Sequence, residues 1–218
     1  MGIEPCHKQW TIVKQDAIIL AGGRARRLQG ADKGALILGG TSLLDRAVLA
    51  VAPARTVVVG PRQPPTARPV LWTREDPPFG GPAAAVAAGL EKLCESGAPA
   101  QHVVLLAVDV AVARDAVDAL QGAVGAEAPA DDGWVAKDPD GHRQPLLGIY
   151  RSDALRGACA RLTTTRGGLD GASMRDLLAP LRLRDVLLEA ALTADIDTPI
   201  QFAAAAAAPE RGPDDRPS

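Results

Sequence analysis

A glycine pair followed by several cations stands out between Leu20 and Gly34, in the stretch LAGGRARRLQGADKG. Gly22 and Gly23 would let backbone N–H groups approach an anion closely, which bulkier residues would prevent. The cations that follow are Arg24, Arg26, Arg27 and Lys33. Guanidinium groups clamp phosphate with two hydrogen bonds and an ammonium adds a compact charge. This combination predicts a phosphate-binding loop.

Two well-known phosphate-binding loops do not fit these residues. A P-loop requires GxxxxGK followed by Ser or Thr, whereas Lys33 lies between Asp32 and Gly34. The Rossmann fingerprint GxGxxG is also absent, because the two glycines are adjacent. The alternative is an ordinary strand-to-helix turn with a solvated basic surface. The ten-residue spacing from Gly23 to Lys33 argues against that alternative.

Carboxylates supply a second kind of chemistry. Asp109 ends the apolar run His102–Asp109, and Asp195 and Asp197 lie in the segment ADIDTP. By itself, Asp109 reads as a solvated strand end or a helix cap. Beside a phosphate loop and another acidic strand end, a magnesium site becomes the stronger interpretation, because a carboxylate leaving an apolar strand requires a cation or donors.

The elements that must position these groups alternate between strands and helices. Buried strands are predicted at 17–20, 56–60 and 102–109, with helices that begin after Ser42 and at Pro82. Such alternation favours a three-layer, mostly parallel, Rossmann-like sheet. Ligands of these sheets bind beyond the carboxyl ends of the strands, which is where the glycines and Asp109 fall.

The second half of the chain predicts an antiparallel insert. A hairpin should pair residues 134–137 with 145–151 around the turn DPDGH. Ser152 is expected to cap a helix to about Leu162, residues 181–186 to form a strand, and Thr198 with Pro199 to open a last helix. We expect a poorly ordered N-terminus at 1–14, one domain over 15–208 and a disordered tail at 209–218.

Composition narrows the functional class. The 218 residues are 47% hydrophobic, and 24 basic against 26 acidic side chains give a net charge of −2, so no global field attracts nucleic acid or an anionic membrane. No long apolar stretch or signal peptide is visible, so we expect a cytoplasmic protein. Cys6, Cys94 and Cys159 have neither disulfide-framework nor zinc-ligand spacing.

Taken together, these motifs resemble a known family. LAGG followed by RRL and DK, then EDPP with GGP, an aspartate that closes a strand, and DIDTP are similar to the nucleotidyltransferases of molybdenum cofactor synthesis, especially those that transfer guanylate. The family pattern LAGGxSxRMGxDK has Ala25 here in place of Ser and Leu28 in place of Met. The resemblance extends from about Asp16 to Phe202.

The resemblance implies a role for each matched position. Nucleotide-binding positions would be Leu20, Ala21, Gly22, Gly23, Lys33, Asp76, Gly81, Pro82 and Asp109. Arg27 and Lys33 would hold the triphosphate, and Asp109 and Asp197 would bind Mg²⁺. The implied reaction transfers GMP from GTP to the terminal phosphate of molybdopterin, the molybdenum cofactor precursor, and releases pyrophosphate. Cofactor-delivery proteins or molybdoenzymes would be its protein partners.

Two positions depart from the family pattern, and they leave rival functions open. The family has DxP where this chain has Asp109, Val110 and Ala111, and an asparagine where this chain has Gly60. The rivals are a cytidylyltransferase for the same cofactor, a sugar-phosphate nucleotidyltransferase, and a non-catalytic nucleotide- or pterin-binding protein. His142 and Arg143 would either meet an anionic acceptor or remain solvated beside their turn.

Overall fold

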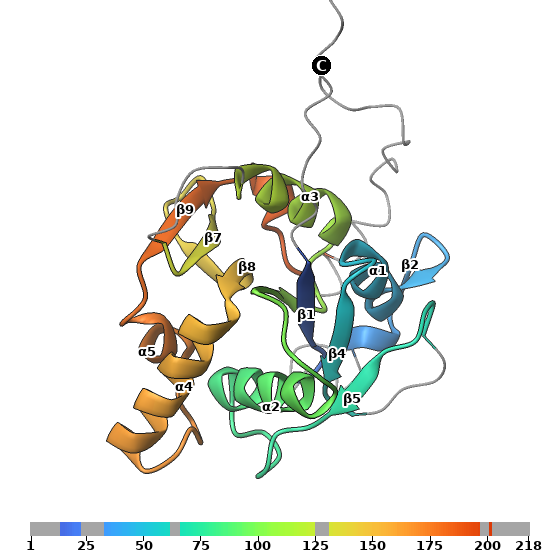
Figure 1. Cartoon of the computed structure of the whole chain (residues 1–218). Helices are drawn as coiled ribbons and strands as arrows, with labels where there is room; N and C mark the ends of the chain where they lie inside the picture. Colours follow the sequence, from blue (N-terminus) through green and yellow to red (C-terminus); the bar gives the residue numbers. More distant parts are fainter. Residues whose placement is uncertain (1–13, 23–32, 62–65, 125–130, 197–200, 202–218) are drawn as a thin grey trace, which may run out of the picture.

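The computed structural model describes residues 14–22, 33–61, 66–124, 131–196 and 201. Its centre is a seven-stranded sheet in the order β5–β4–β1–β6–β8–β7–β9 (Figure 1). The strands are β1 (Gln15–Leu20), β4 (Arg55–Val59), β5 (Leu71–Thr73), β6 (His102–Ala107), β7 (Gly133–Lys137), β8 (Arg143–Arg151) and β9 (Leu183–Leu187). All neighbouring pairs are parallel except those that β8 makes with β6 and β7. The mostly parallel sheet with an antiparallel insert is therefore confirmed.

Helices cover both faces of this sheet and complete the predicted three layers (Figure 1). One face carries α1 (Leu43–Ala50) and α3 (Ala113–Ala123), and the other carries α2 (Pro82–Glu95), α4 (Ser152–Arg166) and α5 (Met174–Leu178). Successive residues of a strand point to opposite faces. Accordingly, Ala17 and Ile19 of β1 belong to the first core cluster, and Ile18 and Leu20 to the second.

Short elements complete the chain between these layers. They are the 3₁₀ turns η2 (Lys33–Ala35) and η3 (Ala190–Leu192), and the two-stranded ribbon of β2 (Ile37–Leu38) and β3 (Thr41–Ser42). The predicted helix at Thr198 and Pro199 and the predicted terminal segments at 1–13 and 209–218 lie outside the described residues. None of the helices within the described ranges is long and apolar enough to cross a membrane.

The first residues of α1, α2 and α4 show which of the predicted helix caps are present. Ser42 caps α1, because its side chain accepts a hydrogen bond from the backbone N–H of Asp45 at 3.0 Å, and Pro82 occupies the first turn of α2. The predicted Ser152 cap is wrong. Arg151 is the N-cap of α4, and Ser152 already belongs to the helix, where its buried hydroxyl has no hydrogen-bond partner among the described residues. The helix therefore starts one residue earlier than expected. The N–H of Ser152, which has no acceptor within the helix, donates to the Gln101 carbonyl at 2.9 Å.

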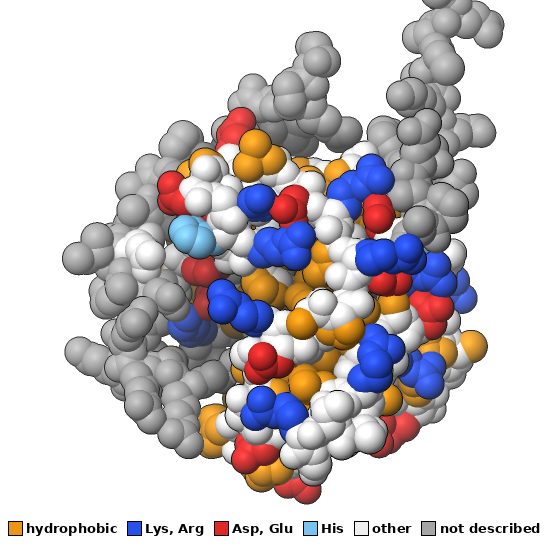
Figure 2. Space-filling model, turned by 90° about the vertical axis from the view of Figure 1, so that its left-hand side faces the viewer, with side chains coloured by type: hydrophobic (Ala, Val, Ile, Leu, Met, Phe, Trp, Pro, Cys, Tyr) orange, Lys and Arg blue, Asp and Glu red, His pale blue; other side chains and the backbone are white. Residues whose placement is uncertain are grey.

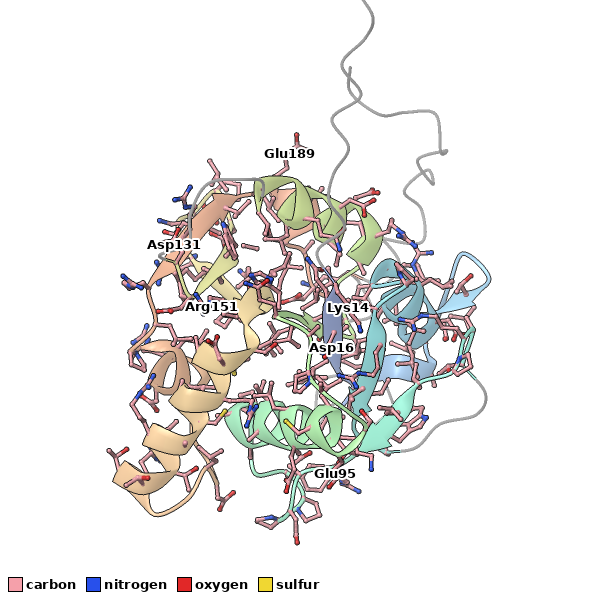
Figure 3. All side chains as sticks on the ribbon, viewed as in Figure 1. Lys14, Asp16, Glu95, Asp131, Arg151 and Glu189 are labelled. Carbon is pink, nitrogen blue, oxygen red and sulfur yellow. The ribbon has the colours of Figure 1, made fainter. Side chains whose placement is uncertain are left out.

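A buried ion pair stabilises the end of the sheet where β1 begins. This end is opposite the glycine loop, the segment that starts with Ala21 and Gly22 after β1. Asp16, at the start of β1 (Figure 3), accepts two hydrogen bonds from Arg55 at 2.7 and 3.0 Å and one from the N–H of Ala100 at 2.7 Å. The carboxylate raises the pKa of the Arg55 guanidinium. Because all these partners come from the protein itself, Asp16 joins β1, β4 and the segment before β6.

Charges on the face formed by β9, α4 and α5 are mixed in sign. Figure 2 shows basic and acidic side chains interspersed there around an apolar hollow. Ion pairs join residues in and next to β7, β8 and β9. Lys137 and Arg143 pair with Asp185, at 3.1 and 2.5 Å, and Arg184 pairs with Asp131 at 2.9 Å. Solvent-exposed pairs of this kind each contribute little stability.

His102, at the start of β6, makes the stability of the fold sensitive to pH. The residue is 7% exposed, and its ring centre lies 5.8 Å from that of Trp134. Its Nδ1 atom has no hydrogen-bond partner among the described residues. Burial, reinforced by the charge of Arg151 and opposed by that of Asp153, lowers its pKa below the ordinary 6.5. Below pH 6.5 the unfolded chain therefore binds a proton at His102 that the folded chain excludes. The contribution of neutral, buried His102 to the free energy of unfolding is complete above pH 6.5. It is lost as the pH falls toward the folded-state pKa of His102.

We expect the melting temperature to decrease between pH 7.5 and 5.5, and His102→Phe to remove part of that decrease. The phenylalanine ring keeps the apolar contact with Trp134 and carries no titrating group. His142→Gln is the matched control, since the side chain of His142 is 77% exposed. Equal pH slopes for the wild type and His102→Phe, measured by calorimetry, would contradict this explanation.

Candidate nucleotide-binding site

A cavity of about 650 Å³ opens at the carboxyl ends of β1, β4 and β6. The chain leaves β1 toward β4 and β5 on one side and returns through β6 on the other side, so the connections diverge beside β1. Ligands of open α/β sheets bind at such a divergence. The volume also falls within the range of ordinary small-molecule sites.

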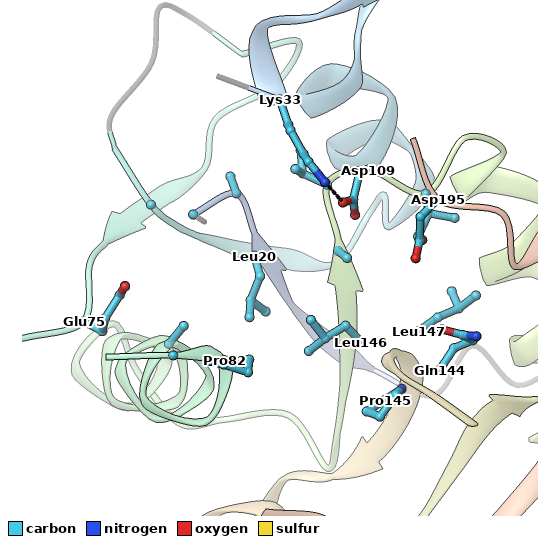
Figure 4. A pocket seen from close by; sticks show the side chains of 18 of the residues that line it. Leu20, Lys33, Glu75, Pro82, Asp109, Gln144, Pro145, Leu146, Leu147 and Asp195 are labelled. Carbon is cyan, nitrogen blue, oxygen red and sulfur yellow. Dashed lines mark hydrogen bonds and ion pairs between the residues drawn. The ribbon is translucent and has the colours of Figure 1, made fainter. Parts of the chain in front are cut away.

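Lys33 and Asp109 meet inside this cavity. Lys33 begins η2 and Asp109 follows β6, and the Lys33 Nζ atom donates a hydrogen bond to Asp109 Oδ2 at 2.7 Å (Figure 4). Their side chains are 21% and 18% exposed, so water screens the pair only partly. Two residues separated by 76 positions thus place an ammonium and a carboxylate side by side. Both were candidates from the sequence, Lys33 for phosphate and Asp109 for a metal ion.

A second carboxylate, Asp195, lines the same cavity (Figure 4). Its position follows from main-chain pairing: Ile196 N–H donates to the Asp109 carbonyl at 2.9 Å, Ala111 N–H donates to the Ala194 carbonyl at 3.3 Å, and Asp195 bridges Val110. A proline at position 111 could not donate the second of these bonds. Alanine in place of the proline of the DxP pattern therefore allows a hydrogen bond that helps to position Asp195.

The glycine loop begins where β1 ends. Leu20, Ala21 and Gly22 line the cavity, and the bond from Ala21 N–H to the Val59 carbonyl at 2.9 Å ties the loop to β4. Gly60 approaches this backbone so closely that a Cβ atom there would lie 2.9 Å from the carbonyl carbon of Ala21. Gly60 is also held at φ +155°, which L side chains rarely adopt. Contact between two backbones thus requires glycine at position 60.

The opposite wall comes from the loop between β5 and α2. Gly81 and Pro82 line the cavity as predicted, and Glu75 does so as well. Asp76, the predicted nucleotide-site carboxylate, is exposed and is not among the residues that line the cavity. Sequence reasoning overlooked Glu75 because the EDPP segment offers two adjacent carboxylates, and only the path of the turn determines which one faces inward.

The third wall is an irregular part of β8. The register between β7 and β8 shifts after Val135, which leaves Pro145, Leu146 and Leu147 projecting along the cavity (Figure 4). Tyr150 stabilises this bulge, because its hydroxyl donates to the Pro145 carbonyl at 2.8 Å. Burial raises the pKa of this hydroxyl far above its ordinary value, so it remains a donor at any physiological pH.

Gln144 completes that wall and connects it to the hairpin turn. Its Nε2 atom donates to Asp138 Oδ2 at 3.1 Å. The backbone N–H of His142 donates to the same carboxylate, and these bonds lower the pKa of Asp138. Asp138, Asp140 and His142 bring ligand atoms within 4.8 Å of one another on this turn, but none of the three lines the cavity. Arg143 pairs with Asp185 instead of entering the cavity.

Some predicted site residues lie outside the described residues, namely Gly23, Arg24, Arg26, Arg27 and Asp197. Those that the structure brings together are Leu20, Ala21, Gly22, Lys33, Gly81, Pro82 and Asp109. Sequence reasoning had noted Asp195 without assigning it to the site, and it had no signal for Tyr150. A glycine loop, the cations Lys33 and Arg74, and the carboxylates Glu75, Asp109 and Asp195 line a cavity at the divergence of a three-layer α/β sheet. This combination is typical of the nucleotide-binding α/β class.

Comparison with known proteins identifies the family. Residues 17–186 match the MobA-like NTP transferase domain, so the chain belongs to that family and is a nucleotidyltransferase. A curated relative, molybdenum cofactor guanylyltransferase of Bradyrhizobium sp. (strain ORS 278), is 31% identical over 139 residues, which are 61% of this chain and 64% of the relative. The match thus spans less than two thirds of the relative's length.

Solved structures confirm the fold at lower identity. Molybdopterin-guanine dinucleotide biosynthesis protein A from Archaeoglobus fulgidus superposes with a TM-score of 0.60 at 19% identity, over 87% of this chain and 96% of that one. The 2-C-methyl-D-erythritol 4-phosphate cytidylyltransferase from Thermus thermophilus gives 0.61 at 19% identity, over 88% and 97%. A nucleoside-diphosphate-sugar pyrophosphorylase from Vibrio cholerae gives 0.57 at 15% identity, over 87% and 99%. The fold is therefore shared by enzymes with different acceptors.

Proposed function

We propose that this protein transfers GMP from GTP to the terminal phosphate of molybdopterin and releases pyrophosphate. The observation that carries the proposal is the Lys33–Asp109 contact of 2.7 Å, made beside the glycine loop and in the same cavity as Asp195. The 31% identical guanylyltransferase supports the choice of donor and acceptor. The fold alone does not distinguish this reaction from the cytidylyltransferase or sugar-phosphate alternatives.

Each side chain would act through position and charge. The backbone of Leu20–Gly22 would lie along the nucleotide, and the Lys33 ammonium would neutralise charge that develops on the leaving pyrophosphate. The attacking phosphate oxygen is already ionised, so the reaction requires no general base.

A magnesium ion fits the carboxylates of this cavity. Asp109 and Asp195 offer hard oxygen ligands, and Mg²⁺ is commonly bound by one or two carboxylates together with phosphate oxygens. When bound, the ion would neutralise phosphate charge and polarise the α-phosphate. Asp197 follows Asp195 by two positions, and we retain it as a further candidate ligand. Without the ion, the contact with Lys33 compensates the charge of Asp109.

A nucleotide panel tests the proposed function. We expect pyrophosphate release from GTP only when molybdopterin and Mg²⁺ are both present, and little release from ATP, CTP or UTP. Removal of divalent ions with EDTA should abolish the reaction, and added Mg²⁺ should restore it. Preference for CTP would instead support the cytidylyltransferase. Tight GTP binding without release under any condition would support a non-catalytic binding protein.

A further inference from the structure

Phe79, in the loop between β5 and α2, has an unusual backbone conformation. Among the described residues, it is the only non-glycine residue with positive φ, at +66°. A bulky side chain in this region is a genuine outlier, and its backbone is strained. Its side chain is 52% exposed and lines the cavity, so the cost is not offset by burial in the core. Strain of this kind is typical of ligand clamps.

Neighbouring groups hold this conformation from several sides. The N–H of Phe79 donates to Glu75 Oε1 at 3.0 Å, and the Arg74 guanidinium carbon lies 5.1 Å from the centre of the ring. Within the loop, Gly80 N–H donates to the Pro77 carbonyl at 3.2 Å. These contacts hold the backbone of Phe79 and place one cation beside its ring before any ligand binds.

A second loop supports the same segment. Gly171 N–H donates to the Gly80 carbonyl at 2.8 Å, and a Cβ atom on Gly80 would lie 3.2 Å from Ala84 and 3.4 Å from Asp170. The residue that follows Phe79 is thus fixed between α2 and the loop before α5. The contacts of Gly80 with these two segments restrain the backbone next to Phe79.

The cavity that Phe79 lines also has apolar lining residues. Leu20, Pro82 and Ala85 are apolar lining residues there. Figure 4 shows Glu75 and Pro82 across the cavity from Asp109, Asp195 and Lys33. The two aspartates suit a cation, and the lysine suits phosphates. A ligand that is charged at one end and flat and aromatic at the other therefore matches the cavity, and a nucleotide has that form.

We propose that Phe79 stacks on the nucleobase of the donor nucleotide and that Arg74 and Glu75 hold its ring for that contact. The inference rests on the proposed nucleotidyl transfer and adds a base-binding residue to it. Stacking on an aromatic ring tolerates any base, because every base has a π-face. Phe79 would thus contribute affinity, and the choice among bases would depend on polar groups of the same wall.

Binding of GTP and of inorganic triphosphate by calorimetry separates the base from the phosphates. We expect Phe79→Ala to weaken GTP at least about tenfold, the effect of losing one base–aromatic stack, and to leave triphosphate affinity unchanged. Phe79→Tyr should retain most of the GTP affinity. Leu187→Ala is the matched control, since Leu187 is an apolar side chain 72% exposed on β9.

Phe79→Gly distinguishes a binding role from a structural one. Glycine adopts positive φ without penalty, so this variant should melt at or above the wild-type temperature while it loses GTP affinity as Phe79→Ala does. Unchanged GTP affinity in both variants would overturn the stacking role, and so would an equal loss for triphosphate. Failure of the wild type to bind GTP would instead overturn the proposed function itself.

Discussion

Replacing Asp109 with asparagine is expected to lower the rate of pyrophosphate release at least about a hundredfold, the loss typical when one preorganised electrostatic group is removed. Asparagine keeps the shape of the side chain but removes its charge. The amide would retain at most a neutral contact with Lys33, which now meets the carboxylate at 2.7 Å. We expect most of the loss in kcat at saturating GTP and Mg²⁺, because the charge acts on the transition state.

Lys33→Ala should produce a loss of similar size for a complementary reason. The ammonium lies 2.7 Å from Asp109, and in the proposed reaction it compensates charge on the leaving pyrophosphate. Its removal also leaves the Asp109 carboxylate, 18% exposed, without this partner. The melting temperature should therefore be recorded with the kinetics, so that a folding defect is distinguished from a catalytic one.

The double variant tests whether the two residues act as one unit. If they do, Lys33→Ala combined with Asp109→Asn should be little slower than either single variant, since residues of one catalytic unit are strongly non-additive. Lys92→Ala and Asp153→Asn are matched controls. Lys92 pairs with Glu95 at 2.9 Å and Asp153 with Arg151 at 2.8 Å, both away from the cavity. Near-full turnover in either single site variant would refute the assignment.

Local signals explain which parts of the fold were predictable. The apolar runs of β1, β4 and β6 are buried on both faces, so their sequences contain little but Val, Ile, Leu and Ala between their ends. Ser42 and Pro82 mark helix starts by their own chemistry. By contrast, β5 has only three residues, all partly exposed, and depends on pairing with β4 for its existence. No local sequence pattern indicates so short a strand.

The same distinction holds at the site. Gly22 and Asp109 were predictable as candidates because each follows the end of an apolar strand, β1 or β6. Lys33 was a candidate because of its ten-residue spacing from Gly23. The inward position of Glu75 depends on the turn that leads to Phe79, and that turn depends on the distant loop at Gly171. The position of Asp195 likewise depends on pairing with residues 109–111. Contacts between segments far apart in sequence decide these positions, so single-residue patterns could not reveal them.

Gly60 leads to the second large expected effect. The family pattern that the sequence resembles has asparagine where this chain has Gly60. That resemblance alone would suggest that Gly60→Asn improves the site. The structure predicts the reverse. A Cβ atom would lie 2.9 Å from the Ala21 carbonyl carbon and 3.0 Å from the Gly22 nitrogen, both backbone atoms that cannot rotate away. We expect Gly60→Asn to reduce the free energy of unfolding by at least about 2 kcal/mol.

The expected loss corresponds to a decrease of roughly 4–8 °C in melting temperature for a chain of this size. Because the clash pushes on Ala21 and Gly22, nucleotide binding should weaken as well, in contrast to a purely global destabilisation. Gly40→Asn is the matched control: Gly40 also has positive φ, at +79°, but a Cβ atom added there would have no atom of the described residues within 4 Å. Asparagine tolerates that region, so Gly40→Asn should change stability little. Equal melting temperatures for the wild type and Gly60→Asn, together with unchanged GTP affinity, would show that the two backbones can separate and that glycine is not required there.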